Sequence, residues 1–161
     1  MDADTVIETL GLRPHPSEGG YFIETYRCND FLDVPGLGRR SVSTAIYYLL
    51  TPDTCSAMHR LASDEVFHFY LGDPVEMLLL RPDGGHETVI LGNDIASGHK
   101  PQFVVPRGVW QGSRLLPGGE FALLGTTVAP GFDFADYEHG NRSDLVARYP
   151  ACADRIKLLS V

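Results

Sequence analysis

A histidine and a glutamate separated by five residues are the side chains of this sequence best suited to chemistry. Both lie in MHRLASDEVFHFYLG, residues 58–72, which reads as two short strands joined by a tight connection at 62–64. Such a connection can bring His59 and Glu65 together on one face of a sheet. An imidazole beside a carboxylate can take up and return a proton, while the carboxylate orients the ring.

The alternation of the second strand places this glutamate among apolar side chains. Successive side chains of a strand point to opposite faces. The face of Glu65 would also carry Phe67, Phe69 and Leu71. An ionised carboxylate there is costly unless it is paired, liganded or functional, and the alternative is that this face is exposed to solvent. His68 falls on the opposite face as a structural histidine, unless a bulge re-aims it.

A second polar group follows the turn Pro106-Arg107-Gly108. This turn begins a new strand, whose inward side chains are expected to include Gln111 and Ser113. The amide of Gln111 can donate and accept hydrogen bonds at once, which suits a small polar ligand. Together with His59 and Glu65 it would give a pocket with few polar groups in an apolar wall.

The elements that must position these side chains are mostly strands. Runs of β-forming residues separated by turn signals recur every 8 to 12 residues between residue 40 and about 128, which predicts a sandwich or barrel. The ends predict a helix over 2–11, a strand over 19–26, a loop over 28–39 and two short helices over 143–159. The expected strand runs are 41–50, 56–61, 65–71, 75–81, 86–91, 102–105, 109–116 and 121–128.

Length and composition fit one soluble globular domain over residues 1–161. The chain has 13 basic and 21 acidic side chains and a formal net charge of −8, which argues against nucleic-acid binding. Its apolar stretches are far shorter than the ~20 residues that span a bilayer, so no membrane partner is expected. The N-terminus does not resemble a signal peptide, and the 3 cysteines form no CxxC pair, so we expect a cytoplasmic location.

Two segments, residues 58–72 and 106–113, resemble the two motifs of the cupin superfamily. Members of this superfamily are small β-barrels of the jelly-roll type. The first motif contains two histidines, a glutamate and a glycine, and its spacing fits His59, Glu65 and Gly72. Leu61 stands where the second histidine belongs. The second motif, Pro-x-Gly-x-x-His, ends at Gln111 instead of a histidine.

Nearly the full chain is similar to one cupin subfamily, cupin-5, which is catalogued mainly as a domain of unknown function. The resemblance implies an all-β, double-stranded β-helix with short helices at both termini. Cupins similar to it include nucleotide-sugar epimerases and seed-storage proteins, and they commonly pair as dimers. We therefore expect a homodimer, in which the strand at 21–26 can pair with the neighbour's sheet. The matching stretches are HPSEGGYF at 15–22, TAIYYLL at 44–50, SDEVFHFY at 63–70 and GTTVAPGFDF at 125–134.

The resemblance implies two enzymatic alternatives. A cupin metal site holds a divalent transition metal with three imidazoles and one carboxylate. Here His59, Glu65 and Gln111 would be the ligands, with His68 as an alternative, so a metal cofactor is not certain.

A metal-free epimerase or isomerase would instead use His59 as general base beside a carbonyl, oriented by Glu65. Tyr21, Tyr47 or Tyr70 would then supply the returning proton.

The interpretation that we favour is a small-molecule-binding cupin that holds a small polar organic ligand in its barrel. His59 and Glu65 form the catalytic pair if turnover occurs. The expected ligand-binding residues are Gln111, Ser113, Tyr21, Tyr47 and Phe67.

Overall fold

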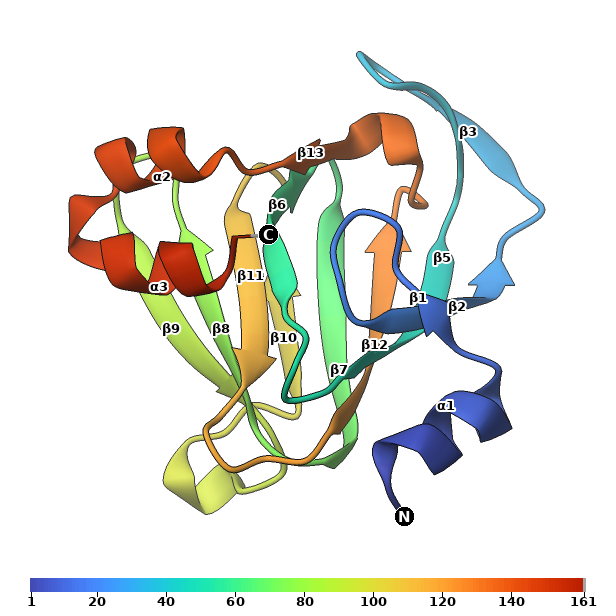
Figure 1. Cartoon of the computed structure of the whole chain (residues 1–161). Coiled ribbons are helices and arrows are strands. Elements are labelled where there is room, and N and C mark those ends of the chain that lie inside the picture. The colour runs from blue at the N-terminus through green and yellow to red at the C-terminus, as the bar shows by residue number, and fades with distance from the viewer. Residues whose placement is uncertain (161) are drawn as a thin grey trace.

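Two antiparallel sheets packed face to face form the barrel of the computed structural model, which describes residues 1–160 (Figure 1). One sheet has six strands in the order β1-β2-β5-β12-β7-β10, and the other has five in the order β13-β6-β11-β8-β9. From β5 to β12 the chain crosses between the sheets at every connection except the β8–β9 hairpin, giving β5-β12-β7-β10 opposite β6-β11-β8-β9. This connectivity is that of a jelly roll, so the predicted all-β fold with short terminal helices is confirmed.

The strands of the barrel follow the predicted runs to within a few residues. The β-formers in these runs alternate between the barrel interior and its outer faces, as a half-buried strand requires. The strands are β1 Arg13–Pro14, β2 Tyr21–Arg27, β3 Phe31–Val34, β4 Gly38–Ser41, β5 Thr44–Leu50, β6 Ser56–Leu61, β7 Asp64–Gly72, β8 Val75–Leu80, β9 His86–Leu91, β10 Gln102–Val105, β11 Trp110–Leu115, β12 Ala122–Ala129 and β13 Tyr137–His139.

The helices lie near the two ends of the chain, as predicted. Asp2 caps the first by accepting a hydrogen bond from the Thr5 N–H (2.9 Å), and Gly11 ends it in the left-handed region (φ 67°). Within residues 1–160 no helix combines the length and apolar character needed to cross a membrane. The α-helices are α1 Ala3–Leu10, α2 Arg142–Arg148 and α3 Ala153–Leu158, and short 3-10 turns occupy Ile95–Ser97, Phe134–Asp136 and Pro150–Cys152.

The loop expected over 28–39 is wrong, because most of it forms the hairpin β3–β4. Gly36 lies in its turn with φ 83°, a conformation that favours glycine. The guanidinium of Arg40 donates two hydrogen bonds of 2.7 Å to Asp136 and so ties the hairpin to the barrel. Figure 1 shows the hairpin projecting from one end of the molecule.

The strand expected over 19–26 forms β2 and pairs with β5 of the same chain, with Tyr21 opposite Leu49 and Phe22 opposite Tyr48. On its other edge β1 pairs only with Tyr21 and Phe22. The suggested pairing of this strand with a neighbour's sheet stays a prediction, as does the homodimer itself.

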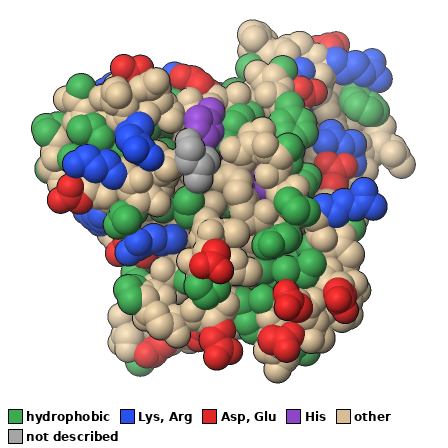
Figure 2. Space-filling model, in the orientation of Figure 1, with side chains coloured by type: hydrophobic (Ala, Val, Ile, Leu, Met, Phe, Trp, Pro, Cys, Tyr) green, Lys and Arg blue, Asp and Glu red, His purple; other side chains and the backbone are tan. Residues whose placement is uncertain are grey.

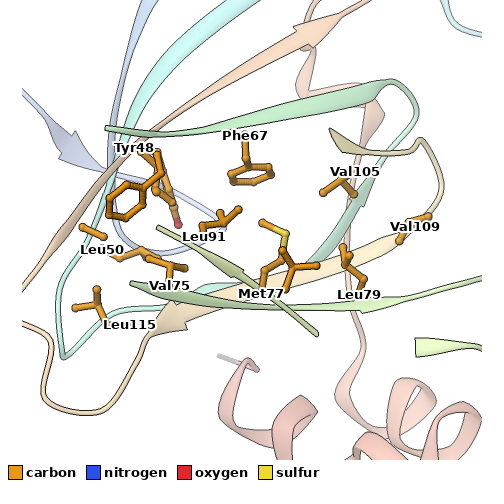
Figure 3. Close-up of a cluster of buried hydrophobic side chains, with 14 residues drawn as sticks. Tyr48, Leu50, Phe67, Val75, Met77, Leu79, Leu91, Val105, Val109 and Leu115 are labelled. Carbon is orange, nitrogen blue, oxygen red and sulfur yellow. The ribbon is translucent and has the colours of Figure 1, made fainter. Parts of the chain in front are cut away.

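Three apolar clusters hold these layers together. The largest fills the space between the sheets, where Phe67 from one sheet and Met77 from the other point into a common interior (Figure 3). A second lies between the five-stranded sheet and the helices α2 and α3, around Trp110 and Ile156. In the third, α1 packs through Val6 against the outer face of the six-stranded sheet. That sheet is therefore apolar on both faces.

A core leucine and a surface leucine provide a test of this arrangement. Leu124 in the central strand β12 is 0% exposed, whereas Leu158 is 55% exposed. We expect Leu124→Ala to lower the free energy of unfolding by about 2–5 kcal/mol through the cavity that it leaves. Leu158→Ala should change it by less than about 0.5 kcal/mol. Urea unfolding followed by circular dichroism measures both, and equal effects would contradict the described packing.

Candidate functional site

A cavity of about 310 Å³ lies between the sheets, at the end of the barrel next to β13 and the 132–134 segment. Its walls come from the β1–β2 connection, from β2, β5, β6, β7 and β12, and from that segment. Its polar lining residues are His15, Glu18, Glu24, Arg27, Thr44, His59, Glu65, Thr126 and Asp133. Its apolar lining residues are Phe22, Ile46, Leu61, Val128, Phe132 and Phe134.

The imidazole of His59 is 2% exposed and is held in one orientation from two sides. Its Nδ1 lies 2.7 Å from the carbonyl oxygen of Ala57, and a carbonyl can only accept, so Nδ1 carries the proton in the neutral ring. The ring stacks on Tyr137 with the centroids 5.2 Å apart. The Nε2 atom therefore keeps its lone pair and borders the cavity, 3.8 Å from Oε2 of Glu18.

The carboxylate of Glu65 lies beside this histidine, as the predicted two-strand unit requires. It is 7% exposed, and its Oε2 accepts a hydrogen bond of 2.7 Å from Nε2 of Gln111. Burial raises the pKa of Glu65, and the negative charge of Glu18 acts in the same direction. The proximity of His59 and the hydrogen bond from Gln111 partly oppose this rise.

Two residues of the site, His15 and Glu18, had no role assigned from the sequence. The backbone N–H groups of Glu18 and Ser17 donate to Nδ1 of His15 at 2.9 and 3.3 Å. In the neutral ring the proton is therefore on Nε2, which lies 3.9 Å from Oε2 of Glu18. Burial lowers the pKa of His15. The hydroxyl of Ser56 donates to Oε1 of Glu18.

One signal in the sequence marks this pair. The two glycines after Glu18 hold the chain where side chains do not fit, since a Cβ at Gly20 would lie 2.8 Å from the carbonyl oxygen of Leu49. Gly20 also has φ 69°, which favours glycine. A His-x-x-Glu spacing before two such glycines therefore points to a fixed turn beside the sheet.

Three of the expected ligand-binding residues lie behind the cavity wall. Gln111 is buried behind Glu65 and reaches the site through its hydrogen bond to that carboxylate. Phe67 is part of the core between the sheets. Ser113 is buried, and its hydroxyl has no hydrogen-bond partner within residues 1–160. None of the three is among the residues that line the cavity.

The placement of the two tyrosines requires a correction. Tyr21 and Tyr47 pack with α1 on the outer face of the six-stranded sheet, whereas Phe22 and Ile46 point into the cavity. Tyr70 meets the ring of Tyr47 edge-on at 5.8 Å. The expected tyrosine proton donors are therefore outside the cavity.

The imidazole of His68 lies on the outer face of β7, on the side that strand alternation predicts. Its Nε2 is 3.2 Å from the hydroxyl of Thr127, and its ring stacks on Tyr70 with the centroids 6.3 Å apart. His68 therefore does not reach the cavity.

The residues around the cavity do not fit the metal site of three imidazoles and a carboxylate. Leu61 occupies the place of one imidazole, and the amide of Gln111 directs an N–H toward Glu65. In the described chain, residues 1–160, no group of three or more His, Cys, Asp or Glu residues is arranged to hold a metal ion.

Restoring the missing imidazoles tests this conclusion. Leu61→His combined with Gln111→His should raise the affinity for Zn²⁺ or Ni²⁺ about tenfold or more, ~1.4 kcal/mol, because imidazole binds these ions far better than an amide or an alkyl group. Isothermal titration calorimetry compares the double variant with each single variant and the unaltered protein. Stoichiometric binding by the unaltered protein after washing with a chelator would contradict our ligand count.

The raised pKa of Glu65 predicts a pH dependence of stability. The folded chain holds the Glu65 proton more tightly than the unfolded chain, whose ordinary value is 4.5. Stability from this group is therefore complete below pH 4.5 and is lost as the pH rises through the folded-state pKa. Glu65→Gln should gain stability relative to the unaltered protein over that range. Urea unfolding at several pH values measures the difference, and a constant difference would refute the assignment.

Comparison with known proteins identifies the family of this chain. Residues 4–140 match the model of the cupin superfamily family DUF985. An uncharacterized protein of Saccharomyces cerevisiae, YML079W, is 38% identical over 133 residues, which cover 74% of this chain and 66% of the yeast protein. The chain thus spans about two thirds of that relative's length.

Solved structures show the same fold. A hypothetical protein from Leishmania major has a TM-score of 0.92 and 32% identity, with 99% of both chains covered. A protein from Shewanella oneidensis has a TM-score of 0.90 and 35% identity, with 100% of this chain and 98% of that chain covered. Oxalate decarboxylase from Bacillus subtilis has a TM-score of 0.57 and 13% identity, over 92% of this chain and 37% of that chain, which shows the jelly-roll fold alone. The chain belongs to the cupin superfamily, in the family DUF985.

Proposed function

We propose that the protein binds a small polar organic molecule in the cavity between its sheets. The observation that carries this proposal is the Nε2 atom of His59. It belongs to a nearly fully buried side chain and borders the cavity, and its nearest charged neighbour, Oε2 of Glu18, is 3.8 Å away. An ionised carboxylate can only accept hydrogen bonds, so Glu18 leaves the lone pair of Nε2 available to a donor of the ligand.

The cost of burying these groups supports a ligand. Native proteins leave few buried polar atoms without a partner, and buried carboxylates are more costly still. Glu65 is buried and Glu18 is partly buried in this apolar barrel, and their neutral side-chain partners are Ser56 for Glu18 and Gln111 and Thr126 for Glu65. A ligand that supplies hydrogen bonds to the remaining acceptors would compensate for this burial.

The size and lining of the cavity fit the same function. At about 310 Å³ it is at the lower end of the range for small-molecule sites. Its apolar side chains can enclose the body of a ligand, and Oε2 of Glu18 lies 3.9 Å from Nε2 of His15 and 3.8 Å from Nε2 of His59. This combination is typical of a preformed binding pocket.

Variants of Glu65 and His59, with a control at His68, test the site. Native mass spectrometry of protein purified without added ligand should detect a bound small molecule, which then serves in titrations. Glu65→Gln and His59→Ala should each weaken its binding about tenfold or more, ~1.4 kcal/mol, because each removes an acceptor from the cavity. His68→Ala is the control, since His68 lies on the outer face of β7, and it should leave the affinity unchanged. Equal effects of the three variants would contradict the proposed site.

The fixed tautomer of His59 supports a second function, proton transfer of the isomerase type. Its Nε2 can accept a proton from a carbon beside a carbonyl, and the nearby carboxylate of Glu18 would stabilise the resulting imidazolium. The returning proton would come from Nε2–H of His15, which replaces the tyrosine donors expected from the sequence.

Hydrogen exchange separates a binding protein from an isomerase. The bound molecule is incubated in deuterated water with the unaltered protein and with His59→Ala. A proton-transfer enzyme should introduce deuterium at a carbon beside a carbonyl, and the variant should not. Binding without exchange or product by the unaltered protein would leave binding as the function and exclude the isomerase.

A further inference from the structure

We infer that the ligand of this cavity is a small organic cation, a protonated amine on an apolar body. The inference rests on the proposed binding function and names its ligand class. Three properties of the cavity lining support it: its hydrogen-bond acceptors, its negative charge and its apolar side chains.

The polar end of the cavity offers mainly hydrogen-bond acceptors. The Nε2 atom of His59 presents a lone pair, because the proton of the neutral ring is committed to the Ala57 carbonyl. The carboxylates of Glu18 and Glu65 can only accept when ionised. Donors of the lining already have acceptors: Nε2–H of His15 faces Glu18 at 3.9 Å, Arg27 donates to Glu24, and the hydroxyl of Thr126 hydrogen-bonds to Glu65. A ligand bound there must therefore donate, and an ammonium group has up to three N–H donors and no acceptor.

The charge of the lining favours a cation. Among the lining residues the carboxylates outnumber the guanidinium, and Arg27 is the one Lys or Arg that borders the described cavity. Arg27 donates to both carboxylate oxygens of Glu24 at 2.9 and 2.7 Å and to the carbonyl oxygen of Phe132 at 3.2 Å. Its charge is thus already paired. Within residues 1–160 no Lys or Arg forms an ion pair with Glu18, Glu65 or Asp133, and the basic neighbours of Glu18 are the imidazoles of His15 and His59.

The apolar wall suits the body of such a ligand. Phe22 and Phe134 both lie against the ring of His15, with centroid distances of 4.6 and 6.3 Å. Aromatic faces attract ammonium groups as well as alkyl groups. On the face drawn in Figure 2, basic side chains gather at the two sides, with hydrophobic side chains between them and acidic groups below.

The same features disfavour anionic ligands. A phosphate or carboxylate would need unpaired cationic donors, which the lining of the described cavity does not offer. It would also meet the carboxylates of Glu18 and Glu65. The sugar diphosphates of the epimerases that the family resembles are therefore poor candidates for this chain.

Three molecules with one carbon skeleton test the inference: cyclohexylammonium, cyclohexanol and cyclohexanecarboxylate. Titrations at neutral pH, followed by NMR of the intact protein, should show the ammonium ion binding about tenfold or more tighter than the alcohol, and the carboxylate not binding. Equal or tighter binding of the alcohol or the carboxylate would overturn the inference and leave the proposed function in place. Failure of all three to bind would also overturn it. The proposed function fails separately, if mass spectrometry finds no bound molecule and no compound binds in the cavity.

A charge-removing variant locates the effect. Glu18→Gln keeps an oxygen that can accept from Ser56 but loses the negative charge. It should weaken cyclohexylammonium about tenfold and leave cyclohexanol nearly unchanged. Glu138→Gln is the matched control, because Glu138 pairs with Arg60 outside the cavity and should have no effect. Glu65→Gln repeats the test if Glu18→Gln does not fold, and unchanged ammonium binding in a folded variant would overturn the inference.

Discussion

Two carboxylates, the buried Glu65 and the partly buried Glu18, are enclosed with the imidazoles of His15 and His59, and the other features of this barrel satisfy that constraint. Each carboxylate has one short hydrogen bond to a neutral side chain, from Ser56 to Glu18 and from Gln111 to Glu65. The imidazole of His59 is in turn fixed by a backbone carbonyl of its own strand. The donors come from β6 and β11, so the five-stranded sheet supplies the support. The six-stranded sheet supplies Glu65 and half of the apolar lining residues.

Strand alternation explains what could be predicted from the sequence. It correctly predicted that Glu65 and His68 point to opposite faces of the sheet, because the part of β7 that holds both residues alternates regularly. It could not assign the faces of β2 and β5, since α1 makes the outer face of their sheet as apolar as the interior, and Tyr21 and Tyr47 lie on that outer face. Glu18 lies in an irregular turn with no periodicity to read, so its role required the three-dimensional structure.

The comparison with oxalate decarboxylase shows how far a shared fold constrains chemistry. That enzyme and this chain have the same barrel, but at 13% identity only the architecture carries over. In this chain Leu61 and Gln111 occupy the places of two imidazoles of the cupin motifs, and what remains is an acid-rich cavity with the imidazoles of His15 and His59 in its lining. The residues inside the barrel therefore decide its function.

The bond between Arg27 and the carbonyl of Phe132 joins residues 105 positions apart in the chain. The cavity is likewise built from an early segment, 15–27, and a late one, 126–134. On the ribosome, the early segment emerges long before its partners exist. The cavity is therefore complete only after Phe134 has emerged, late in synthesis, when most of the barrel strands are already available to pair.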